Sequence, residues 1–158
     1  MITFDEGNLR FNYRVVGVAI DGERVLLHKA EEEDFWTLPG GRGELLEPAR
    51  ETLKREMQEE LDIEVRVGRL VWVVENFFNY DAKSYHELAL YFLMTFPEKS
   101  HVRELTEFPG KDNNVKLLFK WYQLDGLGNI PLYPSFLRTA LKRIPDGTEH
   151  IVHTDGKL

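Results

Sequence analysis

Apolar and β-branched residues gather in several separate segments of this chain, as they do in strands. Residues 13–20 and 24–28 are such segments, and the Asp21-Gly22 pair between them favours a hairpin turn. Three later segments are also predicted to be strands, namely residues 64–74, 85–96 and 115–124. Residues 101–114, which contain Pro109-Gly110, are expected to form a loop.

Two other segments have the spacing of amphipathic helices. Residues 48–61 contain no glycine and carry proline in the first turn, where a helix tolerates it. Their apolar residues lie four positions apart, at Ala49, Leu53, Met57 and Leu61. Residues 134–144 are expected to form a second helix with one apolar side. Strands combined with two separated helices favour an α/β class of fold, in which helices cover the faces of a mixed sheet.

The chain is expected to form one domain over residues 1–158, because this length is usual for a single compact unit. The tail after about residue 145 is mostly polar and is expected to be loose. The longest apolar run, residues 88–94, is far shorter than the roughly 20 residues that a membrane span needs. The first residues also lack the basic and apolar parts of a signal peptide. We therefore expect no membrane association and a cytoplasmic location.

Charge and cysteine content narrow the classes of function. The chain has 27 acidic and 20 basic side chains, a formal net charge of −7. An acidic surface repels polyphosphate backbones, which disfavours broad nucleic-acid binding, yet a bound cation can still bring a small phosphate substrate to such a protein. Cysteine is absent, which excludes disulfides, thiolate metal sites and a cysteine nucleophile.

Acidic side chains crowd the apolar side of the first predicted helix. With Leu53 at zero on a helical wheel, Glu60 falls at about −20°, Glu56 at about −60° and Glu59 at about −120°. Carboxylates so close together repel one another unless a cation lies between them, and Mg²⁺ prefers such oxygen ligands. The spacing therefore predicts a magnesium site at Glu56, Glu59 and Glu60. A solvated acidic helix with pairs such as Arg55–Glu59 is the alternative that the wheel leaves open.

The segment before this helix fits a phosphate ligand. Glycine at positions 40 and 41 lets the backbone approach a ligand closely, and free N–H groups near the start of a helix favour anions. Arg42 in the same loop carries the forked guanidinium that pairs with phosphate oxygens.

These residues together resemble a known signature. Gly41, then Glu47 after five residues, then Arg55-Glu56-Met57-Gln58-Glu59-Glu60 after seven more, and Ile63, are similar to the motif of the Nudix hydrolase family of MutT-like pyrophosphohydrolases. Two positions depart from the motif, since the family usually has glycine where this chain has Leu46 and Asp62. Aspartate at the end of a helix closes it less easily than glycine does.

The resemblance implies a fold, a reaction and roles for residues. The fold would be an α/β/α sandwich around a mixed sheet. The reaction would be hydrolysis of a diphosphate linkage in a nucleoside diphosphate joined to another group, with Mg²⁺ or Mn²⁺ as cofactor. Glu56, Glu59 and Arg55 would be catalytic, and Glu56 would be the leading candidate for the base that activates water. The metal ligands would be Glu56, Glu59 and Glu60, while Glu47 would pair with Arg55 and Gly41 would shape the loop.

Other residues are candidates for contacts with the substrate or for an additional base. Glu87 lies in a strand of otherwise apolar residues and is a candidate metal ligand, base or substrate contact, although an exposed strand glutamate is the alternative. His86 beside it is expected to be an ordinary strand residue. The substrate-binding candidates are Arg42, Glu87, Phe78 and Tyr80. Further aromatic residues that could stack on a base are Trp36, Phe77 and Tyr133. Members of the family often draw an extra acid from a downstream loop, and here the candidates are Glu104, Glu107 and Asp112.

Several alternatives stay open from the sequence. The expected partner is a small nucleotide or another diphosphate compound, and which one is not specified. A catalytically silent Nudix-like module that binds or senses a nucleotide is the main alternative function. A related isomerase of diphosphate lipid precursors ranks low, because that chemistry normally uses a cysteine. Members of the family often form dimers, so a homodimer is one expected assembly.

Overall fold

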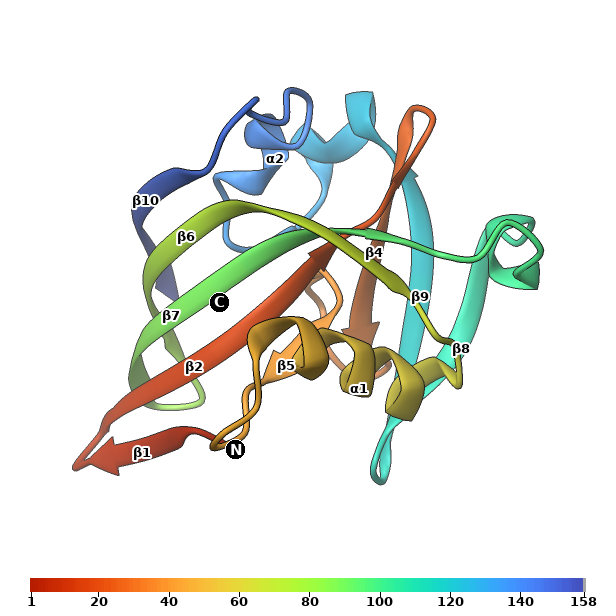
Figure 1. Ribbon diagram of the computed structural model, residues 1–158. Coiled ribbons are helices and arrows are strands. Elements are labelled where there is room, and N and C mark those ends of the chain that lie inside the picture. Colours follow the sequence, from red (N-terminus) through yellow and green to blue (C-terminus); the bar gives the residue numbers. More distant parts are fainter. Residues whose placement is uncertain (158) are drawn as a thin grey trace.

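The computed structural model describes residues 1–157 as two sheets with one long helix between their edges (Figure 1). In spatial order the first sheet contains β1 (Thr3–Glu6), β2 (Leu9–Val18), β7 (Lys83–Thr95), β6 (Arg66–Tyr80) and β10 (Glu149–Lys157), with β5 (Gly40–Arg42) paired to β2. The second sheet contains β3 (Ile20–Asp21), β4 (Arg24–Ala30), β9 (Val115–Gln123) and β8 (Glu107–Asp112). The helical segments are α1 (Ala49–Leu61), α2 (Leu137–Ala140), η1 (His101–Arg103) and η2 (Leu124–Asn129).

The first sheet is mixed, as the sequence predicted. Strands β2 and β7 run parallel, as do β10 and β6, whereas β1 and β5 pair antiparallel with β2, and β6 pairs antiparallel with β7. The predicted hairpin at Asp21-Gly22 joins β3 to β4. The predicted first helix is confirmed as α1.

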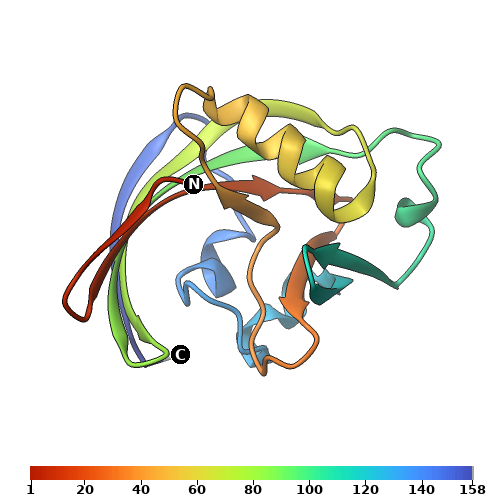
Figure 2. The ribbon, with the colours of Figure 1, turned by 90° about the horizontal axis from the view of Figure 1, so that it is seen from below.

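The two faces of β2 divide the core. Successive strand residues point to opposite faces. Val15 therefore packs in one cluster with Leu53 and Met57 of α1, while Val16 packs in another with Trp72 and Leu137. Helix α1 thus covers one face of the first sheet, and the segment with α2 fills the concave face, around which the sheet curves in Figure 2.

Three segments differ from the sequence-based expectations. The second helix, expected over residues 134–144, is reduced to the single turn of α2. Its apolar residues Leu137 and Leu141 are buried in the core although the segment around them forms short turns. The segment expected to be a loop contains β8 with Pro109 in it, and a proline is tolerated there because β8 is an edge strand.

The tail expected to be loose instead forms β10. It pairs in parallel with β6 from Glu149 opposite Trp72 to Lys157 opposite Asn79. Its pairing partners lie more than 70 positions earlier in the chain, so local composition does not reveal them. Within residues 1–157, no helix has the length and apolar character required to cross a membrane.

Candidate active site

A glycine in β5 makes room for the first carboxylate of α1. A Cβ atom placed on Gly41 would lie 2.1 Å from Cδ of Glu56 and 2.4 Å from each of its carboxylate oxygens. No side chain fits at position 41 unless the carboxylate moves away. Gly41 and Glu56 therefore form one unit, in which the bare backbone of β5 forms one wall of the carboxylate site.

Arg55 organises the outer side of the same site. Its guanidinium donates two hydrogen bonds to Glu47, at 2.8 and 3.0 Å, and one to the carbonyl oxygen of Arg42 at 3.1 Å. It also donates to Glu56 at 2.8 Å and to Glu59 at 3.3 Å. The guanidinium of Arg55 lowers the pKa of Glu47 to about 2. Arg55 thus joins the loop before α1, strand β5 and two acidic residues of the helix.

The three predicted metal ligands differ in burial. Glu56 and Glu60 are 9 % and 5 % exposed, whereas the side chain of Glu59 is 57 % exposed and meets solvent beside Arg55. Burial raises the pKa of Glu56, and burial together with the charge of Glu56 raises the pKa of Glu60 to about 9. The helical wheel placed the same two residues nearest the apolar side.

Glu60 has an unmet carboxylate oxygen. Among the side chains of residues 1–156, Oε2 of Glu60 has no hydrogen-bond partner, and Nδ1 of the buried His28 lies 3.7 Å away, also without one. Burial lowers the pKa of His28 to about 3, so this imidazole is neutral and supplies no charge. The charge of Arg14 lowers the pKa of Glu60 but does not outweigh its burial.

This donor set fits a hard divalent cation. Two buried carboxylates with raised pKa values, one of them with an orphaned oxygen, are what a bound cation would stabilise in the ionised form. Among the side chains of residues 1–156, no three acidic or histidine residues already stand in the arrangement of a metal cluster. Arg55 forms ion pairs with Oε1 of Glu56 and Oε2 of Glu59. The other oxygen of each carboxylate lies outside these ion pairs.

Asp112 is the downstream acid that lies nearest to this site. Its charge contributes to the raised pKa of both Glu56 and Glu60, whereas Glu107 acts on Tyr122 instead. Strand β8 approaches α1 closely, since a Cβ atom on Gly110 would lie 3.0 Å from the backbone oxygen of Glu60. Of the three candidates, the fold therefore brings Asp112 to the carboxylates of α1, and it places no contact between them and Glu104.

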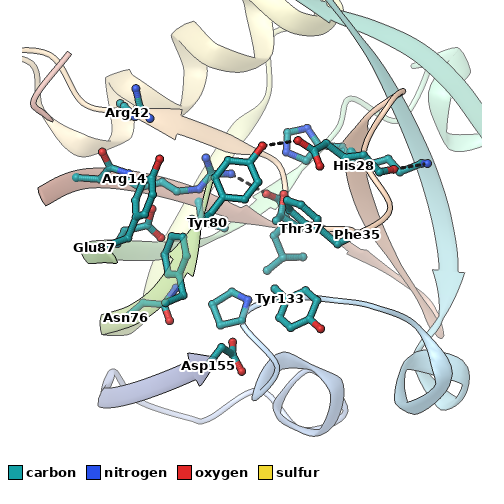
Figure 3. A pocket seen from close by; sticks show the side chains of 18 of the residues that line it. Arg14, His28, Phe35, Thr37, Arg42, Asn76, Tyr80, Glu87, Tyr133 and Asp155 are labelled. Carbon is teal, nitrogen blue, oxygen red and sulfur yellow. Dashed lines mark hydrogen bonds between the residues drawn. The ribbon is translucent and has the colours of Figure 1, made fainter. Parts of the chain in front are cut away.

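A cavity of about 300 Å³ opens between the concave face of the first sheet and the chain around β4 (Figure 3), close to Glu60 but without Glu56, Glu59 or Glu60 in its lining. His28, which approaches Glu60, lines it, and so do Arg14 and Arg42. These two arginines lie side by side because they are register partners on β2 and β5. The end of the cavity next to α1 is therefore basic.

The floor of the cavity carries a row of polar residues that spans three strands. Glu87 of β7 is paired in register with Asn12 of β2 on one side and with Asn76 of β6 on the other. All three are buried, and all three line the cavity. We call these three residues the polar row. Glu87 is therefore not the exposed strand glutamate that the sequence left as an alternative.

Aromatic residues line the cavity beside and across from the polar row, and the sequence candidates separate clearly. Phe78, Tyr80 and Tyr133 line the cavity together with Phe35. Phe35 contacts Tyr80 and Tyr133 edge to face, with ring centroids 5.8 and 6.1 Å apart. Two other candidates do not line the cavity: Trp36 is buried in the core, and Phe77 stacks on the exposed His86 on the other face of the sheet.

Sequence reasoning missed several residues of the cavity. Arg14, Asn12, Asn76 and Asp155 line it, and none of them was a candidate. A signal was present for Asn76, because it lies on the same face of β6 as the buried apolar residues Val74 and Trp72, whereas the corresponding neighbours of Asn12 are Arg10 and Arg14. For Asp155 there was no local signal, since its position depends on the pairing of β10 with β6.

Comparison with known proteins agrees with this geometry. The family model of the NUDIX domain matches residues 11–144. The chain therefore belongs to the Nudix family, and thus to the hydrolases that act on phosphorus-containing anhydrides.

Individual relatives cover nearly the whole chain. A protein of Buchnera aphidicola subsp. Schizaphis graminum described as 8-oxo-dGTP diphosphatase is 24% identical over 155 residues, which are 95% of this chain and 97% of the relative. A MutT NUDIX hydrolase from Burkholderia pseudomallei is 26% identical, with a TM-score of 0.60 over 85% of this chain and 98% of its own. An ADP-ribose pyrophosphatase from Streptococcus suis has a TM-score of 0.59 at 16% identity, over 90% and 98% of the two chains. These matches also agree with the mixed α and β class of the fold.

Proposed function

We propose that this protein is a magnesium-dependent nucleotide pyrophosphohydrolase, which cleaves a diphosphate linkage in a nucleoside diphosphate joined to another moiety. The observation that carries the proposal is the position of the two buried carboxylates, Glu56 and Glu60, next to a cavity whose adjoining wall is basic. A diphosphate placed there meets Arg14 and Arg42 on one side and the acidic side of α1 on the other.

The residues of the chain have separate tasks in this scheme. Glu56, Glu59 and Glu60 would hold Mg²⁺, which when bound neutralises phosphate oxygens and increases the acidity of a water molecule. Arg14 and Arg42 bind and orient the phosphate groups. Arg55 keeps α1 and the preceding loop in register through Glu47, and Glu56 accepts the proton of the attacking water. Phosphoryl transfer depends mostly on positioning and electrostatics, so little other chemistry is needed.

The relatives support a nucleotide diphosphate as the substrate class. The names of two of them, 8-oxo-dGTP diphosphatase and ADP-ribose pyrophosphatase, each refer to a compound in which a nucleoside is joined to a diphosphate. The aromatic wall of the cavity provides flat apolar surface for a base at a site continuous with the basic end.

A substrate panel tests the proposal. Nucleoside triphosphates, nucleotide sugars, ADP-ribose and dinucleotide polyphosphates are incubated with Mg²⁺, with Mn²⁺ or with a chelator, and the products are identified. We expect metal-dependent release of a nucleoside monophosphate, with inorganic diphosphate or the second phosphorylated product, from at least one class. The substitution Glu60→Gln should abolish most of this release, and Glu51→Gln, which removes an exposed charge from the same helix, should not. Absence of cleavage of every diphosphate with either metal would refute the proposal.

A further inference from the structure

Glu87 is a buried carboxylate without a partner inside the protein. It is 8 % exposed, yet within residues 1–156, whose side chains the structure describes, its carboxylate makes no hydrogen bond and no ion pair. It lies on β7, in register with Asn12 and Asn76 and not with any residue of α1. Burying an unpaired carboxylate is costly, so this position favours a ligand that brings hydrogen-bond donors.

The amide neighbours of Glu87 are also incompletely bonded. Asn76 is 3 % exposed, and its Oδ1 has no hydrogen-bond partner in the described part of the chain. Asn12 on the other side accepts a hydrogen bond of 2.8 Å from the hydroxyl of Thr3, which holds its amide in place. The polar row therefore presents a central acceptor with an amide group on either side, and no protein group satisfies its centre.

Charge is distributed unevenly along the cavity. Arg42 lies toward α1, Arg14 and Glu87 lie next to each other below it, and Asp155 lies at the end away from α1 (Figure 3). Ser135 favours the ionised form of Asp155. Its backbone N–H donates a hydrogen bond of 2.9 Å to the carboxylate, and its hydroxyl lowers the pKa of Asp155. Arg14 lies two residues beyond Asn12 along β2, about 7 Å at the rise of a strand. A ligand that matches the cavity is anionic at one end and rich in donors at the other.

The aromatic residues beside and across from the polar row favour a flat group. Phe78 and Tyr80 follow Asn76 on the same face of β6, and Phe35 and Tyr133 meet them from across the cavity. A planar heteroaromatic ring between these residues and the row would place its edge against Glu87.

From these observations we infer that the polar row reads the nucleobase of the substrate, and that it selects a base with two adjacent N–H donors, which is the edge of guanine. This inference rests on the proposed function. A carboxylate accepts two parallel hydrogen bonds from neighbouring N–H groups, and the N1–H and 2-amino groups of guanine are such a pair.

The other common bases match Glu87 less well. Adenine and cytosine offer one amino group beside a ring nitrogen that is itself an acceptor, so one carboxylate oxygen meets a lone pair. Uracil and thymine offer one N–H between two carbonyl oxygens. At least one of these oxygens would face the carboxylate of Glu87 in the polar row, where it can accept no hydrogen bond. Sites built around hydrogen bonds discriminate strongly against ligands that leave a buried polar group unpaired.

Four nucleotides test the inference in the unaltered protein. We expect kcat/KM for GTP to exceed that for ITP, which lacks only the 2-amino group, by about 10- to 100-fold. GTP should exceed ATP and UTP by about 10³-fold or more. Equal kcat/KM for the four nucleotides, or a preference for ATP or UTP, would overturn the inference while leaving the proposed hydrolase function intact.

A conservative substitution locates the preference. Glu87→Gln keeps the shape of the side chain and removes one acceptor, so the advantage of GTP over ITP should fall about 10-fold or more, mainly through KM. Glu75→Gln is the matched control, because Glu75 is the neighbour of Asn76 on the other face of β6, where it contacts His150. The control should keep the preference. An equal loss of activity toward all four nucleotides in Glu87→Gln would show a general structural or catalytic role and overturn the inference.

A binding measurement separates this inference from the proposed function. Calorimetric titration with GMP in the presence of a chelator needs neither metal nor turnover. We expect GMP to bind the unaltered protein and Glu75→Gln more tightly than AMP, and Glu87→Gln to lose this difference. The thermal midpoint of Glu87→Gln should equal or exceed that of the unaltered protein, since an unpaired buried charge is removed. If GMP and AMP bind the unaltered protein equally, the row does not read the base.

Discussion

The acidic side of α1 and the polar row both bury carboxylates next to one cavity, but they are built in different ways. The first is local, because Glu47, Arg55, Glu56 and Glu60 come from one loop and helix and are held by the several hydrogen bonds of Arg55. The polar row joins β2 to the consecutive strands β6 and β7, which come much later in the sequence. The first region is therefore specified by a short segment, whereas the second also depends on the long-range pairing of β2 with β7.

The largest expected effect is a loss of kcat when a carboxylate of α1 is replaced, and it differs in kind from the effect expected at the polar row. Glu56→Gln and Glu60→Gln should lower kcat about 10³-fold or more for every substrate, because they remove ligands of the metal. They should leave the ratio of kcat/KM between bases unchanged, in contrast to Glu87→Gln. Kinetics on two substrates with different bases measure both quantities. A change of the base ratio in Glu60→Gln would show that the two regions are not separate.

A smaller effect is expected from Gly41→Ala. The added methyl group overlaps the carboxylate of Glu56, which must move, so activity should fall by about 100-fold. The midpoint of thermal unfolding should change little, since the displaced group is the end of a side chain. Gly126→Ala, where a Cβ meets nothing within 4 Å, is the control. Normal activity in Gly41→Ala would mean that Glu56 does not need its observed position.

Acid stability should report the pair of Glu47 and Arg55. The pKa of Glu47 falls to about 2 in the folded protein, below its ordinary value of 4.5. Its contribution to stability is therefore complete above about pH 4.5 and is lost as the pH falls toward 2. Glu47→Gln should lower the free energy of unfolding at pH 7 by about 1–3 kcal/mol and have a smaller effect near pH 2. Urea unfolding at the two pH values tests this. An equal loss at both would assign the effect to packing.

The smallest effect concerns the loop before α1. Leu46 is fully exposed and has a φ of 64°, a left-handed conformation that costs a residue with a Cβ about 1–2 kcal/mol. Leu46→Gly should therefore raise the free energy of unfolding by roughly 0.5–1 kcal/mol after the added chain entropy of glycine is subtracted. Urea unfolding measures it, and the same substitution at the exposed Leu45, for which no positive φ is found, should not stabilise the protein.

The sequence predicted the local part of the molecule well. Helix α1 and the hairpin at Asp21-Gly22 follow from spacing and turn residues, which act over a few positions. The departures from the family motif also fall where backbone conformation explains them. Leu46 and Asp62 both have positive φ, and glycine adopts such angles without strain.

The remaining parts depend on contacts that local pattern does not contain. Strand β10 forms only because β6 offers it an edge, and it brings Asp155 into the cavity. The burial of Glu87 was partly visible, because it alternates with Ala89 and Tyr91, which are typical core residues. Its neighbour Asn76 lies close by in the sequence, across the turn between β6 and β7, whereas Asn12 could not be placed beside it without the order of the strands.

Binding of Mn²⁺ to the acidic side of α1 tests the central claim most directly. Free Mn²⁺ gives a sharp electron paramagnetic resonance signal that is lost on binding, so a titration counts bound ions without any substrate. We predict saturable binding to the unaltered protein and to Glu51→Gln, and binding weakened by at least about 10-fold in Glu60→Gln. Equal affinity in all three proteins, or no binding in any of them, would contradict the assignment of these carboxylates as a metal site.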